Sequence, residues 1–455
     1  MTGIAGIIGA DAGKVASKLD LALGAMKSRG SLVQSITIDG EYGSIALGIC
    51  THQLERSSQA NVERTSFVVD GAIPASLELE GVGGEVRREA FSESIREPAA
   101  FALLAISEGR LIAGRDILGQ KPLYYGRDSQ GAVAFATLKA GLWRTGISDV
   151  KAVAPGHLLA AATNKPVTTL ANKTLSSPKE LRVGEEEAST RIGQLLLESL
   201  AEDAPEDYVT AFSGGLDSTL VANAAKENGL QPELVGVGMK GQAELNHARN
   251  VARNLGLDIT IRELTETDVL NRLLEVVETV ESSDPVLVGV SVPLFFACEV
   301  AQEMGMRHLL AGQLSDELFA GYGRFDELAL TNRFQEARKE VLRSVLAAAT
   351  NDFEPGDKLA VSHQLELQCP FAYLPLVEYA LRIPISLKLR VIGKTVVRKY
   401  VLRRLAASWK LPESVVNRPK KAVQYSSGVQ KVLLKEAKKQ EMTLHDLLDS
   451  LRSNS

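Results

Sequence analysis

The stretch that decides the fold of the second half of the chain is Tyr208-Val-Thr-Ala-Phe-Ser-Gly-Gly-Leu-Asp-Ser-Thr-Leu-Val221. Its apolar beginning, residues 209–212, predicts a buried parallel strand. The two glycines predict a tight loop, and the residues from Asp217 onward predict a helix. Glycines let the backbone approach a ligand closely, and unpaired N–H groups at a helix start favour an anion. The stretch therefore predicts an anion-binding loop at the end of a strand.

The acid in this loop narrows the kind of anion. Asp217 would repel a bare phosphate, so it predicts a divalent cation between carboxylate and phosphates. Ser213, Ser218 and Thr219 add hydroxyl donors beside Gly214 and Gly215. The loop lacks the Gly-Lys-Ser/Thr ending of a Walker loop, so cleavage between the β and γ phosphates is not implied. The run resembles the pyrophosphate loop of ATP pyrophosphatases, which implies ATP cleavage between the α and β phosphates. A glycine turn without a ligand is the alternative.

Short apolar segments alternate with helical ones after this loop. Strands are expected from Leu234 and Asp258, with a helix over 243–255 between them. This alternation predicts an α/β doubly wound parallel sheet, whose ligands lie at the carboxyl ends of the strands. Met239 follows the second strand and is expected either to line an adenine pocket or to be plain core.

Composition describes an ordinary globular protein. The 455 residues are 45% hydrophobic and 24% charged, which suggests about two or three domains. The net charge of −5 gives no electrostatic reason to expect nucleic acid or an anionic membrane as partner. Cys50, Cys298 and Cys369 have no metal-binding spacing, and we find neither an apolar run of about 18 residues nor a leader, so a cytoplasmic location is expected.

Residues 1–165 are expected to form an α+β domain, followed by a linker over 166–185 and the ATP-binding domain over 186–455. Strand-like segments dominate the first domain, with a helix over 12–29. Its stretch Arg115-Asp-Ile-Leu-Gly-Gln-Lys-Pro-Leu-Tyr-Tyr125 resembles the glutaminase domain of class II amidotransferases, the N-terminal half of glutamine-hydrolysing asparagine synthetases. The resemblance implies an Ntn-hydrolase-like αββα fold.

The glutaminase chemistry itself is expected to be lost. The resemblance implies a nucleophilic cysteine after the initiator Met, and Thr2 stands there instead. The family's Asn-Gly oxyanion contact matches Asp70-Gly71, and a carboxylate opposes a developing oxyanion. The family's arginine that binds the glutamine carboxylate is replaced near Thr51. A Thr2-driven hydrolase and another binding use remain alternatives to a domain that only packs.

A second acidic motif follows another apolar strand, in Gly312-Gln-Leu-Ser-Asp-Glu-Leu-Phe-Ala-Gly-Tyr322. It resembles the Ser-Gly-Glu-Gly-Ser-Asp-Glu-Leu-Phe-Gly-Gly-Tyr motif of asparagine synthetases. Two strand-end aspartates, Asp217 and Asp316, could share a Mg²⁺ that bridges a leaving pyrophosphate. The alternative is that Asp316 only caps a helix.

Basic segments near the C-terminus complete the resemblance. It implies that Lys399 holds pyrophosphate and that Lys420, with Lys421 as fallback, stabilises the negative charge of the transition states. Otherwise these lysines form a solvated helix face. A helix from Lys358 is expected to carry Glu366, a candidate base or orienter. The tail from Lys431 is expected to be a surface helix.

Departures from the family concern the substrates. Val286, Leu287 and Gly289 stand where the resemblance implies two threonines and an arginine for aspartate. Loss of a bidentate carboxylate clamp disfavours so polar a ligand. Gln313 replaces a glutamate and cannot accept a proton from an attacking ammonium. Lactam-forming relatives also lack that glutamate.

These observations predict an asparagine-synthetase-like amide ligase that uses ATP and Mg²⁺. It would adenylate a small-molecule carboxylate and then use ammonia or an amine rather than glutamine. Asparagine synthesis, a lactam- or peptide-forming ligase and a nucleotide-binding regulatory pseudoenzyme are the alternatives. No nucleic acid or membrane partner is expected, and a homodimer is one open oligomeric state.

Overall fold

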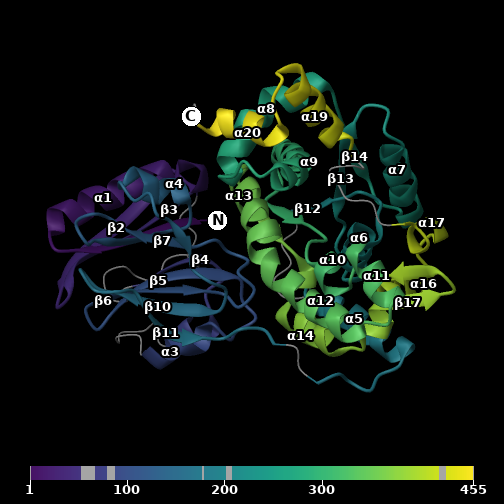
Figure 1. Ribbon diagram of the computed structural model, residues 1–455, viewed down its shortest axis with the longest axis horizontal. Helices are drawn as coiled ribbons and strands as arrows, with labels where there is room; N and C mark the ends of the chain where they lie inside the picture. The colour runs from purple at the N-terminus through teal and green to yellow at the C-terminus, as the bar shows by residue number, and fades with distance from the viewer. Residues whose placement is uncertain are drawn as a thin grey trace. The chain divides into compact units, whose positions relative to one another are not determined.

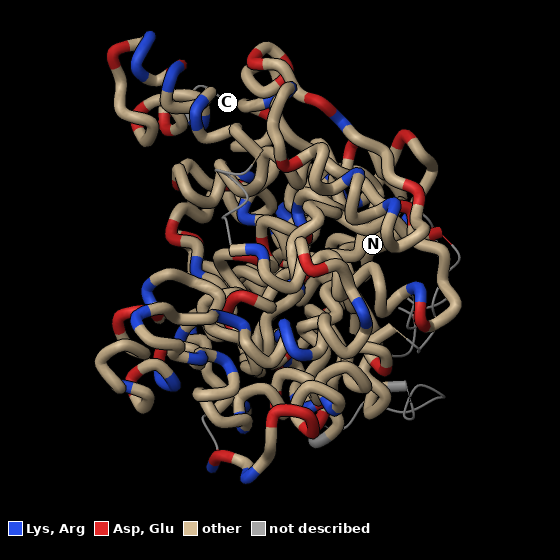
Figure 2. Tube along the Cα trace, turned by 90° about the vertical axis from the view of Figure 1, so that its right-hand side faces the viewer, with Lys and Arg blue, Asp and Glu red and all other residues tan. Residues whose placement is uncertain are grey.

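The structure is a computed structural model that describes residues 2–52, 67–78, 88–176, 179–200, 207–419 and 427–453. Two compact units follow one another along the chain, Met1–Leu175 and Ser176–Ser455 (Figure 1). Acidic and basic residues are interspersed along the trace, in keeping with the small net charge (Figure 2).

Two antiparallel sheets form the centre of the first unit. Their strands are Thr2–Gly9 (β1), Leu32–Gly40 (β2), Gly43–Thr51 (β3), Phe67–Gly71 (β4), Phe101–Ser107 (β5), Arg110–Arg115 (β6), Tyr124–Arg127 (β7), Val133–Ala136 (β8), Lys151–Ala152 (β9), His157–Ala161 (β10) and Thr168–Asn172 (β11). The strand orders are β2-β3-β1-β8-β7-β9 and β11-β10-β6-β5-β4. Ile8 and Phe135 from one sheet share a core cluster with Leu104 and Leu111 from the other.

Helices cover the outer faces of both sheets. One face packs on α1 (Ala12–Ala25) and α4 (Lys139–Arg144), and the other packs on α3 (Arg88–Ser94), which follows the short α2 (Ala75–Glu78). The layers are therefore αββα, and the prediction of this fold is confirmed. The expected linker over 166–185 starts too early, because β11 pairs with β10 and belongs to the first unit.

The Arg115-to-Tyr125 motif is structural. The Arg115 guanidinium donates to the carbonyl oxygens of Gly119, Lys121 and Val153 at 2.8, 2.7 and 3.0 Å. The Asp116 carboxylate accepts from the backbone N–H of Leu118 at 3.0 Å. Burial, the largest influence on Asp116, raises the pKa of its carboxyl group. This motif therefore folds a buried loop rather than a site.

A five-stranded parallel sheet forms the centre of the second unit. Its strands are Tyr208–Ala211 (β12), Glu233–Met239 (β13), Ile259–Leu264 (β14), His308–Leu310 (β15) and Glu366–Gln368 (β16). Their order, β14-β13-β12-β15-β16, places β12 in the middle of the sheet. The prediction of a doubly wound parallel sheet is confirmed, with the glycine loop following the central strand.

Helices make up most of the rest of the second unit. They are Glu185–Glu198 (α5), Leu216–Glu227 (α6), Ala243–Leu255 (α7), Glu266–Val280 (α8), Pro285–Glu303 (α9), Ser315–Leu318 (α10), Arg324–Leu330 (α11), Phe334–Ala348 (α12), Glu354–Ser362 (α13), Leu374–Arg382 (α14), Ile385–Lys388 (α15), Tyr400–Ser408 (α16), Glu413–Val416 (α17), Val429–Lys439 (α19) and Leu444–Ser453 (α20). A π-helical turn, Ala349–Phe353, joins α12 to α13, and the hairpin Leu389–Ile392 (β17) and Thr395–Arg398 (β18) precedes α16.

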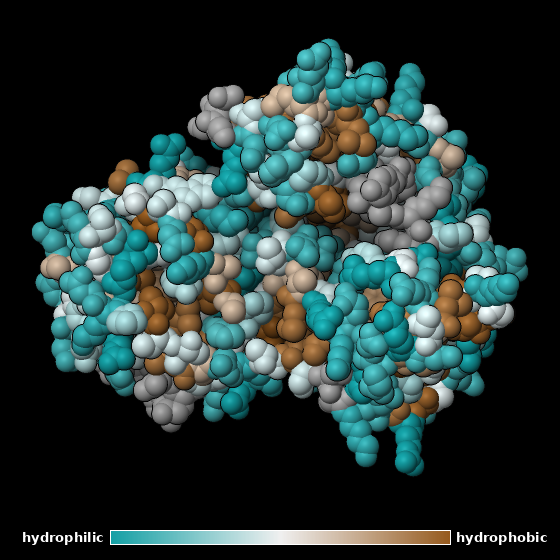
Figure 3. All heavy atoms as spheres, in the orientation of Figure 1, coloured by the Kyte–Doolittle hydropathy of each residue, from teal (hydrophilic) through white to brown (hydrophobic). Residues whose placement is uncertain are grey.

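One expectation about apolar segments is wrong. The helix α9 is long and apolar enough to cross a membrane, although no such run was expected. Its side chains pack with α8, α13 and the sheet, so it is a core helix (Figure 1). The tail lies in α19 and α20, which bury Leu433 and Leu448 in the same cluster and leave Leu434 51% exposed, as expected of amphipathic surface helices. The face in Figure 3 is largely hydrophilic, with small separate hydrophobic patches.

Candidate active site

The glycine loop between β12 and α6 has a backbone that only glycine fits. Gly214 has a φ of +66°, and a Cβ there would lie 3.0 Å from the Cα of Ala248 and from the Cδ2 of His247. His247 Nε2 lies 2.9 Å from the Gly214 carbonyl oxygen, and burial lowers the pKa of the imidazole. Sequence reasoning missed this support because α7 is remote from the loop in sequence.

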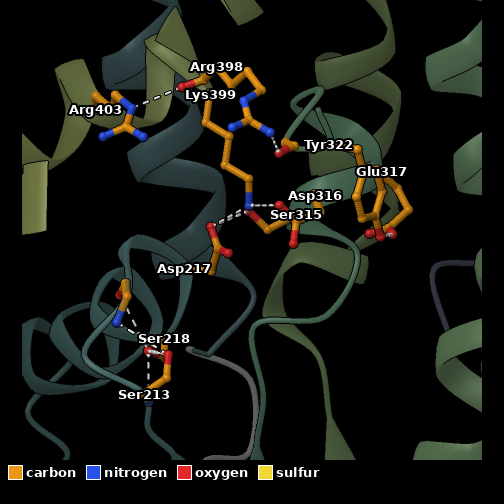
Figure 4. A network of polar contacts seen from close by, with 12 residues as sticks. Ser213, Asp217, Ser218, Ser315, Asp316, Glu317, Tyr322, Arg398, Lys399 and Arg403 are labelled. Carbon is orange, nitrogen blue, oxygen red and sulfur yellow. Dashed lines mark hydrogen bonds and ion pairs between the residues drawn. The ribbon is translucent and has the colours of Figure 1, made fainter. Parts of the chain in front are cut away.

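Hydroxyl groups hold the loop from within. Ser218 Oγ accepts from the Ser213 backbone N–H at 3.3 Å and lies 3.2 Å from Ser213 Oγ (Figure 4). Ser213 Oγ accepts from the Gly215 N–H at 3.2 Å. Ser213 is exposed and Gly215 partly exposed, whereas Thr219 is fully buried. The exposed end of the loop can therefore meet a ligand, and Thr219 supports it from the core.

Asp217 and Asp316 lie on either side of one ammonium group. Lys399 Nζ is 2.7 Å from Asp217 Oδ1 and 2.6 Å from Asp316 Oδ1 (Figure 4). Asp217 is in the first turn of α6, and Asp316 is in α10 just after β15. Because β12 and β15 are parallel neighbours, their carboxyl ends bring the two acids together.

Ser315 joins the same cluster. Its Oγ donates to Asp217 Oδ1 at 2.8 Å and accepts from Lys399 Nζ at 3.2 Å. Sequence reasoning did not select Ser315, although its place beside Asp316 at a helix start was a usable signal. Gly312 permits the approach of the two segments, since a Cβ there would lie 3.0 Å from the Asp217 Cβ.

A further glycine shapes the position of Lys399. A Cβ at Gly321 would lie 1.9 Å from Asp316 Oδ1 and 2.4 Å from Lys399 Cε. Lys399 has a φ of 53°, the left-handed conformation that few non-glycine residues adopt, and it is the N-cap residue directly before α16. The lysine side chain is 3% exposed. Its ammonium is thus directed at the two carboxylates by backbone and packing together.

Arginines tie the surrounding segments together. Arg398 donates to the Gly321 carbonyl oxygen at 3.0 Å. Arg403 donates to the carbonyl oxygens of Arg398 and Arg418, each at 2.9 Å. Burial lowers the pKa of the Arg403 guanidinium, with Arg398 adding to the effect. Sequence reasoning assigned Arg403 no role, yet it joins the Lys399 turn to the segment before residue 420.

A buried acid and phenol lie beside Asp316. Glu317 is 5% exposed and accepts a hydrogen bond from the Tyr322 hydroxyl. Burial first, and then the Asp316 charge, raises the pKa of the Glu317 carboxyl group. Burial and Glu317 likewise raise the pKa of the Tyr322 hydroxyl. This pair holds the loop that carries Asp316.

The donor set suits Mg²⁺ bound together with phosphates. Carboxylate oxygens are the ligands that Mg²⁺ prefers, and it usually takes one or two of them with substrate phosphates. Across the part of the chain that the structure describes, no three His, Cys, Asp or Glu side chains gather as a metal site. A pair of aspartates beside the glycine loop matches that mode of binding.

The other residues singled out in the sequence have the following positions. Met239 ends β13 and donates its backbone N–H to Ser427, 2.8 Å away. Lys420 and Lys421 lie outside the described residues. Gln313 accepts from the Cys369 thiol at 3.3 Å.

Glu366 does not lie with the loop. The expected helix carrying it is wrong, because α13 ends at Ser362 and Glu366 begins β16. Glu366 pairs with His308, which in turn pairs with Tyr208 at the start of β12. It therefore lies at the amino edge of the sheet, opposite the edge that carries Asp217, and this position offers no support for a base role there.

Thr2 of the first unit lies in a closed polar cluster. Its Oγ donates to Asp70 Oδ1 at 3.0 Å, and Arg29 Nη1 donates to Asp70 Oδ2 at 2.7 Å. Thr2, Asp70 and Arg29 are 3%, 0% and 1% exposed. Burial raises the pKa of the neighbouring Cys50 thiol to about 11. Arg29 was not anticipated from the sequence.

Comparison with known families decides the assignment of the chain. The asparagine synthase model matches residues 192–351 and 333–454, more than half of the protein. The chain belongs to the asparagine synthase family. A glutamine amidotransferase domain model matches residues 59–143. Family membership makes the second unit an ATP-dependent ligase of the type that forms AMP and pyrophosphate.

Relatives agree with this family. A glutamine-hydrolyzing asparagine synthetase from Methanocaldococcus jannaschii is 28% identical over 78% of this chain and 74% of its own length. Asparagine synthetases from Arabidopsis thaliana and Oryza sativa subsp. japonica are 27% and 28% identical over 76% and 75% of this chain. The matches span 61% and 59% of these plant proteins.

Solved structures resemble the chain only weakly. A glutamine phosphoribosylpyrophosphate amidotransferase from B. subtilis has 15% identity and a TM-score of 0.28, over 57% of this chain and 65% of its own. An NMN synthetase from Francisella tularensis has 12% identity and a TM-score of 0.31, over 59% and 87%. Similarity at this level does not bear on function.

Proposed function

We propose that the protein activates a small-molecule carboxylate with ATP and joins it to ammonia or to an amine. The carboxylate attacks the α phosphorus, pyrophosphate leaves, and the nitrogen then displaces AMP from the acyl-adenylate. The observation that carries this proposal is the convergence of Asp217, Asp316 and Lys399 at the end of the glycine loop. This cluster supports cleavage of ATP between its α and β phosphates rather than nucleotide binding without reaction.

Each residue of the cluster has a task in this proposal. The loop over 213–219 binds the phosphates with its backbone N–H groups. Asp217 and Asp316 would hold Mg²⁺, which neutralises phosphate charge when bound. Lys399 would bind the leaving pyrophosphate, and Lys420, or its neighbour Lys421, would stabilise the charge that develops during both displacements. Met239 and Gly312 would line the nucleotide site.

We infer that glutamine is not the nitrogen source. The Asp70 carboxylate accepts hydrogen bonds from both Thr2 and Arg29. The Thr2 hydroxyl that would attack glutamine is therefore hydrogen-bonded and buried. A fixed negative charge beside Thr2 would oppose a tetrahedral oxyanion. These contacts support a packing role for the first unit, with free ammonia or an amine supplied from solution.

We infer also that the carboxylate is less polar than aspartate. Val286 is 63% exposed at the start of α9, and Leu287 is partly buried beside it. Asp284 caps this helix by accepting from the Val286 and Leu287 N–H groups at 2.9 and 2.8 Å. An acidic cap and aliphatic side chains suit an apolar acid better than a second carboxylate. A cytoplasmic location is part of the same proposal.

The decisive experiment is carboxylate-dependent ATP–pyrophosphate exchange. A panel of apolar, aromatic and hydroxylated acids, with aspartate included, is tested with Mg²⁺ and then with ammonia or simple amines. We expect exchange with an apolar acid, AMP release on adding the nitrogen, and no exchange with Asp217→Asn. Absence of exchange with every acid would overturn the proposal, and exchange with aspartate alone would establish asparagine synthesis instead.

A further inference from the structure

The Lys399 ammonium lies in the position that a divalent cation shared by Asp217 and Asp316 would take. Nζ is within 2.7 Å of an oxygen of each carboxylate and 3.2 Å from Ser315 Oγ (Figure 4). A Mg²⁺ ion lies about 2.0–2.1 Å from its oxygen ligands. An ion that reached the same two oxygens would overlap the ammonium and repel its charge. The two cations therefore exclude one another.

The lysine also has a structural task in this position. Two carboxylates brought this close repel each other unless a positive charge lies between them. The Lys399 side chain is 3% exposed, while the Asp217 and Asp316 side chains are 18% and 14% exposed, so water screens the pair poorly. Gly321 leaves just enough room for the Cε of the lysine against Asp316.

We propose that Lys399 is an internal counter-cation that holds the metal site closed, so that Mg²⁺ binds only together with a nucleotide. This inference rests on the proposed function in one respect, which is the binding of a nucleoside triphosphate at the glycine loop. Asp217 is two residues beyond Gly215, so the phosphates would lie within reach of Nζ. The phosphates then attract the Lys399 ammonium away from the two aspartates. The carboxylates of Asp217 and Asp316 become free to bind Mg²⁺.

Two consequences follow from this exchange of cations. The protein has low affinity for a divalent metal alone, because the metal must displace a paired and buried ammonium without replacing its anions. A nucleotide removes that cost, so metal and nucleotide strengthen each other's binding by equal factors. A protein that carries no ammonium at residue 399 should bind metal alone and show much weaker coupling.

The test is Mn²⁺ titration followed by electron paramagnetic resonance, with and without the α,β-methylene analogue of ATP. A titration without protein corrects for Mn²⁺ held by the analogue in solution. In the wild-type protein we expect the analogue to tighten Mn²⁺ binding at least tenfold. In Lys399→Met we expect Mn²⁺ alone to bind at least tenfold tighter than in wild type, and the analogue to add less than threefold.

Lys358→Met is the matched control. Lys358 is also buried and lies 2.7 Å from a carboxylate, that of Glu281. Its ion pair is with Glu281 rather than with Asp217 or Asp316, so Mn²⁺ should bind this variant no better than wild type. Thermal unfolding gives a second measurement, in which Mn²⁺ raises the midpoint of Lys399→Met and not that of Lys358→Met.

Wild-type binding of Mn²⁺ alone as tightly as Lys399→Met would overturn the inference, and so would unchanged Mn²⁺ affinity with the analogue bound. The second result needs only the wild-type protein with and without the analogue, so it can overturn the inference even where Lys399→Met does not fold. Failure of the proposed function gives a different pattern, in which the coupling is intact but no carboxylate supports pyrophosphate exchange.

Discussion

Arg29 Nη1 lies 2.7 Å from Asp70 Oδ2, and both side chains are excluded from solvent. A buried ion pair that loses one partner leaves an uncompensated charge, which costs roughly 3–5 kcal/mol. We therefore expect Asp70→Ala to lower the free energy of unfolding by about that amount, measured by urea denaturation. The control is the surface ion pair of Lys151 and Asp149, whose charged atoms lie 3.3 Å apart. Asp149→Ala should change the free energy of unfolding by less than about 1 kcal/mol.

The same pair explains why a single substitution should not restore glutamine hydrolysis. Thr2→Cys supplies the thiol that the related glutaminases use, but it leaves the Asp70 carboxylate beside the nucleophile. We expect glutamate release from glutamine to stay at the level of the wild-type protein. Release above that level by Thr2→Cys would show that Asp70 and Arg29 do not close the site, and glutamine would return as nitrogen donor.

Much of this arrangement could be predicted from the sequence, and the reason is the parallel sheet. Strands of this kind have short apolar runs, and their carboxyl ends meet at one edge, so Asp217 and Asp316 were expected together. For the first unit the strand-like segments predicted an α+β domain, and the family resemblance implied its αββα layers. The strand patterns are local signals that tertiary packing reinforces.

The rest depends on contacts that the sequence does not display. Glu366 lies in a three-residue strand, too short for its alternation to differ from a helix, and pairing with β15 decides its position. Lys399 was expected at pyrophosphate, but its place between the aspartates depends on a left-handed backbone and on space at Gly321. Arg29 reaches Asp70 from a separate turn of the chain.

Gly321 gives a direct test of that spacing. A Cβ there would lie 1.9 Å from Asp316 Oδ1, so Gly321→Ala must displace the acid or Lys399. We expect a loss of stability of about 1–3 kcal/mol and a fall in pyrophosphate exchange of at least tenfold. Gly323→Ala is the matched control, because its Cβ would meet only Arg398 Nη1, at 3.7 Å. Equal activity of the two variants would contradict the geometry described for the cluster.

The two aspartates should act as a unit. If both hold one metal, Asp217→Asn and Asp316→Asn should each lower kcat/KM by on the order of 10²–10⁴, and the double variant should be little worse than either alone. Steady-state release of pyrophosphate measures all three. Losses that multiply in the double variant would indicate two independent tasks instead of one shared ion.

Lys388 predicts a pH dependence of stability. Its ammonium lies 5.8 Å from the centre of the Phe319 ring. Burial, with Arg338 adding to it and Glu180 opposing it, lowers the pKa of Lys388 from 10.5 to about 7. Above pH 7 the folded protein therefore holds this lysine neutral, while the unfolded chain keeps the proton up to pH 10.5.

Because the unfolded state binds more protons in this window, the contribution of Lys388 to the free energy of unfolding rises with pH, by up to about 1.4 kcal/mol per pH unit. Lys388→Met removes that contribution, so the difference in stability between Lys388→Met and wild type should be largest at pH 7 and shrink towards pH 10. Urea denaturation of both proteins at matched pH values measures the difference and cancels the titration of all other groups. A difference that stays constant from pH 7 to 10 would show that Lys388 keeps its proton in the folded state.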